Sequence, residues 1–556
     1  MRREPERPHA PPRRSLPRAA ALSLAAVAFV ACAASPSPRS LPLPLPSPPT
    51  PPSAPPPTAS AEPAPPAATA QETLAKSDLT DPAESKHPSP DTAPPPPSAA
   101  ARLTSQGYVT WVYSRPRADE HRFLGYIRYG TSVALRSTDT VRGENCPGGF
   151  YPVEPRGFVC KDRTVTLAPT PAFLAQAAAT APSPGPFPYR YALSNGTPMY
   201  NRVPTPDEAR RRENPFGPAG KWQPLYRTLA AHEDLASPEP IVASGATPPF
   251  LTLGGLAAEG RIGLERQVIP LGSMLSFTRA FTAEGRTWLL STDQTIVPAD
   301  RVRAFRPSAF HGTRLDDETP LPLAWIRGKA RSMFRRNAAS ALEKTTSDWP
   351  LRSHVALTGA RIIEGGTRYL ETRNRDAKGS PLYLAEADAT VVEVPEKPLF
   401  ALRPGKKTIY ISITQGTLIA YEGLTPVFTT LISPGAGGVP EKGRDPVHAS
   451  TTPLGTYTIT FKDRAATMSP ETGDNRSFWI ADVPYTQYFN PPFALHASYW
   501  HERFGEPTSA GCVNLSPLDA QTMFEWSDPP VPAEWQGATG AGAPENGLTT
   551  TIVVTR

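Results

Sequence analysis

Proline restricts the folding of this chain more than any other residue, because its distribution is very uneven. The chain has 556 residues, of which 72 are proline, and much of this proline lies within residues 33–100, in runs such as LPLPLPSPPTPPSAPPP. A segment of Pro, Ala, Ser and Thr cannot bury enough apolar area to fold, and its prolines favour an extended polyproline conformation. At about 3.1 Å per residue, such a segment reaches up to roughly 200 Å. We therefore expect residues 32–100 to be a disordered tether.

An export signal precedes this tether. Several arginines come before the apolar run of residues 19–31, which is too short for a permanent membrane helix but long enough for the core of a signal peptide. The run ends in the letters FVAC, which resemble a bacterial lipobox, whose cysteine, here Cys32, is lipidated. We predict a lipoprotein-type signal peptide over residues 1–31, a membrane anchor at Cys32 and a location in the periplasm or cell envelope. Plain secretion with cleavage nearby is the alternative.

The charge of the chain gives little support for nucleic-acid binding. The formal net charge is +6 at pH 7, and residues 1–31 alone contain six arginines and two glutamates. The rest of the chain therefore carries only about +2, and the basic character partly reflects the targeting segment. We expect no nucleic-acid partner, no cofactor and a monomer.

Export also determines how the four cysteines are interpreted. An oxidising compartment favours a disulfide between Cys146 and Cys160, and closing this short loop contributes on the order of 3 kcal/mol to stability. With Cys32 assigned to the anchor, we expect Cys512 to remain unpaired. An unpaired thiol in an oxidising compartment is a liability unless it carries out chemistry.

Short alternating runs with turn signals indicate small β modules between the tether and residue 398. In residues 101–170, the order Arg-Pro, Leu-Gly, Gly-Thr-x-Val and Gly-Phe-Val resembles bacterial Src-homology-3-like domains, which implies a small antiparallel barrel that either targets the cell wall or acts as a spacer. We predict a β-rich middle region of uncertain type over residues 185–345 and a further small β module over residues 346–398. Neither region shows a catalytic constellation.

The groups that carry chemistry gather in residues 494–515. Cys512 is a nucleophile only as the thiolate, so it needs a base to take its proton. His496 lies sixteen residues earlier, a separation that suits a partnership made by folding. Ser509 and Gly511 belong to a run of small residues before the thiol, which lets a substrate backbone approach and leaves amides for an oxyanion.

This stretch resembles the signature of the L,D-transpeptidase catalytic domain, the YkuD-like family. That signature runs His-Gly, then about fifteen residues, then Ser-His-Gly-Cys-x-Arg/Asn. His496-Ala497 matches its first part, the run from Ser509 to Asn514 matches its second, and the upstream runs TPLGTY and VPYTQYF fit as well. The resemblance extends over residues 406–556 and implies a mainly β fold, with a β-sandwich or sheet domain and a short helix after the nucleophile.

The resemblance implies a cysteine L,D-transpeptidase that acts on the stem tetrapeptides of peptidoglycan. Cys512 would attack the carbonyl of the third residue, D-alanine would leave, and an amine or water would resolve the thioester. His496 would be the base, and the backbone carbonyl of Ala497 would orient its ring. Gly511 and Cys512 would supply oxyanion amides. We expect further support from Ser509 and Asn514, and substrate contacts from Tyr499, Trp500 and His501.

Two positions depart from the signature and leave alternatives open. Ala510 stands where the family usually has histidine, and Ala497 stands where it usually has glycine. An L,D-carboxypeptidase or amidase that uses the same site is one alternative, and a wall-binding lipoprotein with a decayed catalytic domain is another. A zinc site built from His496, His501 and Cys512 lacks an obvious fourth ligand, so we predict no metal.

Local patterns place the elements of residues 406–556. Alternating apolar residues on either side of Gln415-Gly416 predict a hairpin, and the runs TTPLGTYTITFK, SFWIADVPYTQYF and TTTIVVTR each predict a strand. Ser516 is a good N-cap, followed by Pro517 and an acid in the first turn, which predicts a helix to about Trp526. Cys512 is thus expected on a loop just ahead of a helix.

Overall fold

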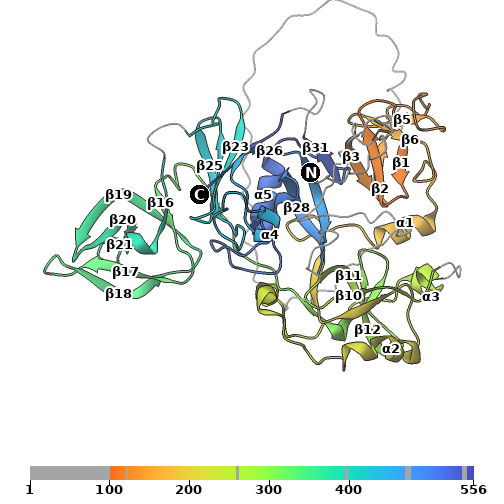
Figure 1. Ribbon diagram of the computed structural model, residues 1–556, viewed down its shortest axis with the longest axis horizontal. Coiled ribbons are helices and arrows are strands. Elements are labelled where there is room, and N and C mark those ends of the chain that lie inside the picture. The colour runs from red at the N-terminus through yellow and green to blue at the C-terminus, as the bar shows by residue number, and fades with distance from the viewer. Residues whose placement is uncertain (1–100, 120–122, 258–261, 395–398, 470–477, 541–547) are drawn as a thin grey trace, which may run out of the picture.

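The computed structural model describes residues 101–119, 123–257, 262–394, 399–469, 478–540 and 548–556 (Figure 1). Strands dominate it, from β1 (Arg102–Ser105) to β32 (Thr551–Thr555), so the prediction of a mainly β chain is confirmed. The predicted signal peptide, the tether and the anchor at Cys32 lie outside the described residues. Within the described ranges, no helix combines the length and hydrophobicity that a bilayer-spanning segment needs.

The first β module is built from two small sheets around one apolar core. One sheet has the order β4-β1-β7, and in the other β3-β2-β6-β5 are neighbours. The expected disulfide between Cys146 and Cys160 is present, with the two Cα atoms 5.9 Å apart. The further strands of this module are β2 (Val109–Tyr113), β3 (Phe123–Arg128), β4 (Ser132–Ala134), β5 (Phe150–Pro152), β6 (Phe158–Cys160) and β7 (Val165–Thr166).

Helix α1 (Pro171–Ala178) leads into a second β module, residues 190–304. Its longest strand, β11, forms a hairpin with β12, and β8 and β9 join the same sheet. Helix α2 begins with a capping box, in which Thr205 and Glu208 satisfy each other's backbone amides. The elements are β8 (Arg190–Ser194), β9 (Thr197–Tyr200), α2 (Pro206–Glu213), α3 (Pro249–Thr252), β10 (Glu265–Ile269), β11 (Met274–Ala283), β12 (Arg286–Ser291), β13 (Ile296–Pro298) and β14 (Val302–Ala304).

A third β module, residues 323–392, forms a separate sheet of order β18-β17-β21-β20-β19-β16-β22 at the left of Figure 1. The boundary expected between residues 345 and 346 falls inside β18, so this sheet begins earlier in the chain than the sequence pattern indicated. Its strands are β16 (Leu323–Trp325), β17 (Arg331–Arg336), β18 (Leu342–Trp349), β19 (His354–Glu364), β20 (Thr367–Arg375), β21 (Pro381–Ala385) and β22 (Thr390–Val392).

The C-terminal domain, residues 406–556, packs two sheets around one helix. Its first sheet has the order β15-β25-β24-β23-β32-β26, with β15 (Thr313–Arg314) added from the preceding linker. The hairpin predicted at Gln415-Gly416 is confirmed by the pairing of β23 with β24. The run TTPLGTYTITFK is divided between β26 and β27 instead of forming one strand. These strands are β23 (Lys407–Ser412), β24 (Thr417–Glu422), β25 (Thr425–Leu431), β26 (Gly455–Thr458) and β27 (Phe461–Met468).

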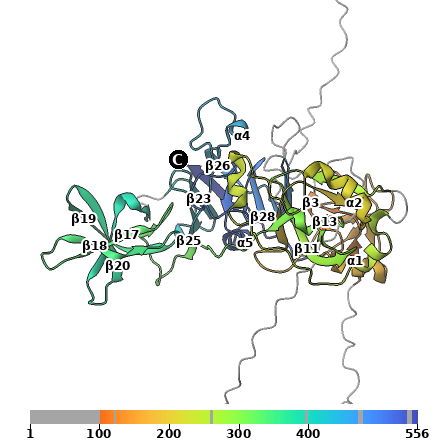
Figure 2. The same cartoon turned by 90° about the horizontal axis from the view of Figure 1, so that it is seen from below.

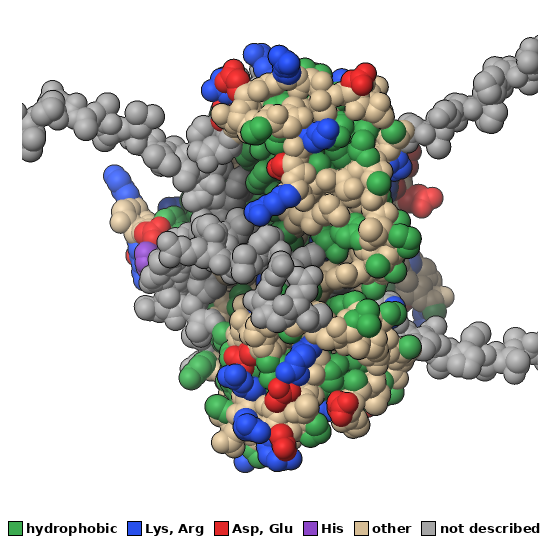
Figure 3. Space-filling model, turned by 90° about the vertical axis from the view of Figure 1, so that its right-hand side faces the viewer, with side chains coloured by type: hydrophobic (Ala, Val, Ile, Leu, Met, Phe, Trp, Pro, Cys, Tyr) green, Lys and Arg blue, Asp and Glu red, His purple; other side chains and the backbone are tan. Residues whose placement is uncertain are grey.

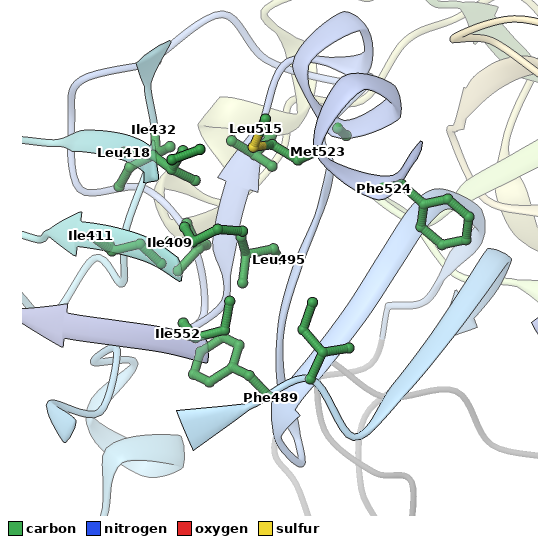
Figure 4. Packing of buried hydrophobic residues seen from close by; sticks show 14 of the residues in the cluster. Ile409, Ile411, Leu418, Ile432, Phe489, Leu495, Leu515, Met523, Phe524 and Ile552 are labelled. Atoms are coloured by element: carbon green, nitrogen blue, oxygen red, sulfur yellow. The ribbon is translucent and has the colours of Figure 1, made fainter. Parts of the chain in front are cut away.

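The second sheet of this domain carries β28 to β31, and helix α5 lies between the sheets. Buried aliphatic and aromatic side chains from both sheets and from α5 form the main core of the domain (Figure 4). Figure 4 labels Ile409, Ile411, Leu418, Ile432, Phe489, Leu495, Leu515, Met523, Phe524 and Ile552. The remaining elements are α4 (Pro446–Ala449), β28 (Ile480–Asn490), β29 (Phe493–Ala497), β30 (Val513–Leu515), α5 (Pro517–Trp526) and β31 (Gly537–Thr539).

Both ends of α5 are fixed by polar groups. At its start, the Ser516 hydroxyl accepts from the amide of Asp519, so the predicted N-cap is confirmed. The buried Asp519 carboxylate also accepts from the amide of Gly312 at 2.7 Å, and burial raises its pKa to about 6. At the other end, the ammonium of the fully buried Lys462 donates to the carbonyl of Ser527 at 2.8 Å. Burial lowers the pKa of Lys462 to about 7, and the same amine also donates to the carbonyl of Phe524, so it satisfies carbonyl groups at the end of the helix.

Two backbone pairings merge the first two modules with the C-terminal domain. Strand β3 pairs antiparallel with β31, and β11 pairs parallel with β28, which produces a continuous 16-stranded sheet. Shared apolar clusters strengthen both junctions, since Trp535 belongs to the core of the first module and Tyr191 of the second module packs with Tyr499. Trp325 of the third module likewise shares a cluster with Phe504.

A buried ion pair lies where the first two modules meet the C-terminal domain. The Arg128 guanidinium is 3.8 Å from the Asp482 carboxylate, and the Ser276 hydroxyl donates to the same carboxylate at 2.5 Å. Each of these residues comes from a different part of the chain. Removing one partner would leave a buried charge uncompensated, so we expect this contact to hold the parts together in one geometry.

Gly125 provides a test of the sheet junction. A Cβ at this position would lie 2.1 Å from the carbonyl oxygen of Gly537 on β31. We expect Gly125→Ala to lower the free energy of unfolding by about 1–3 kcal/mol, because the two strands must move apart. Gly263→Ala is the matched control, since its Cβ would meet only one atom, at 3.9 Å. Urea unfolding with equal midpoints for both variants would show that the junction does not constrain the fold.

Candidate active site

The parallel pair β29 and β30 brings the predicted residues together. His496 is paired in register with Asn514, and Cys512 immediately precedes β30. Side chains alternate along a strand, so Ala494 and His496 share one face of β29. The Cys512 side chain packs in the same cluster as Ala494, away from the main core. The candidate base and the candidate nucleophile therefore lie on the same face of two neighbouring strands.

His496 is held as a neutral base. Its side chain is buried, and Nδ1 lies 3.0 Å from the backbone carbonyl of Ala497, the contact expected from the sequence. Because a carbonyl oxygen only accepts, Nδ1 carries the proton, which leaves Nε2 with a lone pair. Burial lowers the pKa of His496 to about 4. The ring is therefore unprotonated at neutral pH and able to accept a proton.

Cys512 differs from expectation in its bonding state. It is almost fully buried, and its Sγ lies 4.0 Å from the carbonyl oxygen of Pro492. It is also disulfide-bonded. The expectation of an unpaired thiol is therefore wrong for this structure, which contains no free cysteine among the residues that it describes. Any chemistry at Sγ requires that this bond first be reduced.

Ser509 and Gly511 shape the turn ahead of the thiol. Gly511 has a φ of +124°, and a Cβ there would lie 2.6 Å from the Phe493 ring, so only glycine fits this position without strain. The Ser509 hydroxyl donates to the carbonyl of Cys512 at 2.5 Å and accepts from the amide of Gly511 at 3.1 Å. The Gly511 amide, which the sequence suggested as an oxyanion donor, is therefore already engaged.

His501 supports Asn514 from inside the domain. Its side chain is fully buried, and its Nδ1 accepts from the amide of Arg503 at 3.2 Å. The neutral ring therefore carries its proton on Nε2, which faces the Asn514 side-chain amide at 2.9 Å. The Nε2–H group of His501 needs an acceptor, and Oδ1 of Asn514 has no other hydrogen-bond partner among the described residues. The Asn514 side chain is therefore oriented with Oδ1 toward the ring. His501 is thus occupied internally instead of being presented to a substrate.

Tyr499 and Trp500 are also buried. Tyr499 donates through its hydroxyl to the carbonyl of Ala481 at 2.9 Å and stacks on Tyr191, with ring centroids 3.7 Å apart. The Trp500 ring lies 6.0 Å from the His496 ring. In this structure both side chains are packed inside the protein and brace the site.

Residues 406–553 match the family model of the L,D-transpeptidase catalytic domain. The chain carries an L,D-transpeptidase catalytic domain. No curated protein matches the chain.

Solved structures similar to this chain include several L,D-transpeptidases. One from Xylanimonas cellulosilytica is 20% identical, with 30% of this chain and 64% of that chain covered and a TM-score of 0.19. One from Stackebrandtia nassauensis is 23% identical, with coverages of 29% and 62% and a TM-score of 0.18. One from Mycobacterium tuberculosis is 16% identical, with coverages of 41% and 77% and a TM-score of 0.19. The chain thus spans less than two thirds of the first two relatives.

The second β module holds the loop that connects the two halves of the L,D-transpeptidase signature. We call residues 498–506 the connecting loop. Arg503 forms a bidentate ion pair with Asp234, with both N–O distances at 2.7 Å. The amide of Leu235 donates to the carbonyl of Trp500 at 3.2 Å. Bidentate arginine pairs are geometrically specific, so the module fixes the path of this loop beside His496.

The third β module holds the same loop from another side. Arg352 pairs with the Glu502 carboxylate at 2.7 Å, and Arg327 donates to the carbonyl of Gly505 at 3.1 Å. These partners are separated by 150 and 178 residues, so no local pattern in the sequence could have revealed them.

The first β module contacts the L,D-transpeptidase domain next to Cys512. Phe123 and Tyr126 pack against the cluster that contains Cys512. The Tyr126 ring stacks on Phe461, with centroids 6.3 Å apart, and its hydroxyl donates to the Asp463 carboxylate at 2.7 Å. Burial raises the pKa of this carboxyl to about 6. Sequence reasoning missed both Tyr126 and Asp463, which lie 337 residues apart.

The buried histidines predict a pH-dependent stability. Burial lowers the pKa of His232 to about 4, of His496 to about 4 and of His501 to about 3, whereas an unfolded histidine titrates near 6.5. Below pH 6.5 the unfolded chain binds protons that the folded chain does not. Each of these histidines therefore destabilises the fold as the pH falls, by up to about 1.4 kcal/mol per pH unit.

A variant isolates this effect from the buried carboxyls of Asp463 and Asp519, whose raised pKa values act in the opposite direction. We expect His232→Gln to unfold with a flatter pH dependence than the wild type between pH 7 and pH 4.5, as measured by urea titration. His448→Gln is the control, because that side chain is exposed. Identical slopes for the wild type and His232→Gln would contradict the role of the buried ring.

Proposed function

We propose that the protein is a cysteine L,D-transpeptidase that acts on peptidoglycan stem tetrapeptides. The observation that carries this proposal is the neutral imidazole of His496, tied through Nδ1 to the Ala497 carbonyl and placed on the same face as Cys512. Such an arrangement leaves Nε2 to take a proton from a thiol. The family match of the domain supports acyl transfer as the reaction class.

The reaction follows from these groups once a thiol reductant has cleaved the Cys512 disulfide by thiol–disulfide exchange and has itself been oxidised to a disulfide. His496 Nε2 takes the proton of Sγ, and the thiolate forms a bond to the carbonyl carbon of the third stem residue. The bond from that carbon to the D-alanine nitrogen then breaks, and the imidazolium returns its proton to the leaving amine. An acceptor amine attacks the thioester and loses a proton to His496 Nε2, the new amide forms, and the released Sγ takes this proton back. These acyl-transfer steps involve no electron transfer and no cofactor.

A covalent probe tests the two catalytic assignments. We expect a carbapenem to add its mass to the reduced full-length protein and to leave Cys512→Ala unmodified. His496→Ala should be acylated on the order of 10²–10⁴-fold more slowly, because the thiol loses its base. His448→Ala is the matched control and should react at the wild-type rate, since this histidine is exposed on α4. An adduct that persists in Cys512→Ala would refute the nucleophile assignment.

Product analysis decides which reaction the site completes. Purified peptidoglycan treated with the reduced enzyme should yield cross-links between two diaminopimelates if an amine is the acceptor. Shortened tripeptides would indicate an L,D-carboxypeptidase, and unchanged muropeptides without a thioester would indicate a wall-binding protein.

Ala510→His restores the residue usual in the family, and we expect faster turnover with unchanged acylation if this imidazole serves substrate positioning.

We also propose that the protein, in the form in which Cys512 is reduced, is exported and anchored to a membrane through a lipid on Cys32. The supporting observations are the arginines, the apolar run and the FVAC junction near the N-terminus. In a bacterial host, a fatty-acid analogue should label the wild type and fail to label Cys32→Ser, which should move to the soluble fraction. Equal labelling of both proteins would reject the anchor.

The proposal includes no nucleic-acid partner. On the face shown in Figure 3, the described Lys and Arg side chains are interspersed with Asp and Glu at the top and at the bottom of the view. A nucleic-acid surface instead gathers positive charge in one patch or stripe. The mixed charge of this face is consistent with the low net charge that the chain carries outside residues 1–31.

A further inference from the structure

A cavity of about 440 Å³ lies between the second β module and the L,D-transpeptidase domain. The segment around β8 and the residues that follow β14 line most of it, and Tyr499 of the connecting loop completes it. Its volume is in the range of small-molecule and peptide-binding pockets. The reaction proposed above makes no use of it.

The cavity carries uncompensated positive charge. Arg190 and Arg306 line it, and its lining includes no aspartate or glutamate. Nη1 of Arg190 is buried and has no hydrogen-bond partner among the described residues. The guanidinium lies over the Phe277 ring, 4.7 Å from its centroid. A buried donor without an acceptor is costly, so an anion in this cavity that draws Nη1 out of its buried position would gain a strong, charge-assisted hydrogen bond.

Aromatic rings supply the apolar part of the cavity. Tyr191 and Tyr499 are stacked with an interplanar angle of 13°, and Phe305 lies 5.6 Å from Tyr499 between ring centroids. Tyr189 and Thr278 also line the cavity, and the Tyr189 hydroxyl accepts a hydrogen bond from Arg128. A few convergent polar groups between flat apolar walls are typical of a site for a small organic ligand with one charged end.

We propose that this cavity binds a carboxylate group of a peptidoglycan stem peptide, with Arg190 and Arg306 on the carboxylate and the tyrosine rings against the peptide. The preference for a carboxylate rests on the planar, two-donor geometry of guanidinium groups. The choice of the stem peptide rests on the proposed function. The cavity is thus a second peptide subsite, separate from the face that carries Cys512.

The cavity is linked to the active site through adjacent residues. Tyr499 forms part of its wall, and the next residue, Trp500, lies 6.0 Å from the His496 ring. A peptide held against Tyr499 therefore contacts the same loop that packs against the candidate base. Binding here retains a strand of substrate close to the nucleophile and raises its local concentration.

Calorimetry with the stem tetrapeptide L-Ala-γ-D-Glu-meso-diaminopimelate-D-Ala tests the proposal. We use the full-length Cys512→Ala protein, so that no turnover occurs. We expect Arg190→Gln, added to this background, to weaken binding about tenfold or more, because the charge-assisted hydrogen bond is lost. Amidation of the peptide carboxylates should have the same effect. Arg211→Gln should bind as before, since this arginine is exposed on α2 of the same module.

Further variants keep the result interpretable. Arg190→Lys retains the charge without the planar fork and should bind with intermediate affinity, which covers the case in which Arg190→Gln does not fold. With Cys512 intact, Arg190→Gln should still be acylated by a carbapenem at the wild-type rate. Equal tetrapeptide affinity in the Arg190→Gln and parent proteins, or equal affinity for the amidated peptide, would overturn the proposal. A loss of binding in Arg190→Gln without any acylation in the wild type would support the cavity and refute the proposed function.

Discussion

Backbone hydrogen bonding between strands from distant parts of the chain is the constraint on which this structure depends. β28 pairs with β11 of the second module, and β31 pairs with β3 of the first module. Because β29 and β30 are attached to β28, the strands that carry His496 and Cys512 extend from this shared sheet. Removal of either module would expose strand edges beside the site, and such edges invite aggregation. The modules are therefore structural parts of the L,D-transpeptidase domain.

The connecting loop links the β modules to the candidate catalytic residues. It runs between the candidate base and the candidate nucleophile, and it receives the guanidinium of Arg352 and the carboxylate of Asp234. It also holds His501, whose ring fixes Asn514 beside His496 in the register of β29 and β30. A change in the position of either module would thus act on the spacing between the candidate base and the candidate nucleophile.

Local features of the sequence predicted much of the catalytic domain. The hairpin at Gln415-Gly416 and the N-cap Ser516 depend on residues close in sequence, and each leaves a composition signal. The junction contacts leave none, since Tyr126 reaches Asp463 across 337 residues. The bonding state of Cys512 was also missed, because cysteine count and compartment do not decide which thiols meet. Residues 499–501 are buried because other parts of the chain, including the second β module, pack against them. The spacing of residues within the motif does not predict such contacts.

The position of the first β module, directly after the residues ahead of Arg102, has a mechanical consequence. Any tension on residues ahead of Arg102 enters the fold through the first β module. That module is joined to the sheet of the L,D-transpeptidase domain by the short β3–β31 pairing, in which Gly125 faces Ala538 and Tyr126 faces Gly537. The pairing lies next to the aromatic cluster around Cys512. A pulling force applied there would therefore load the wall of the thiol site, to which the first β module contributes.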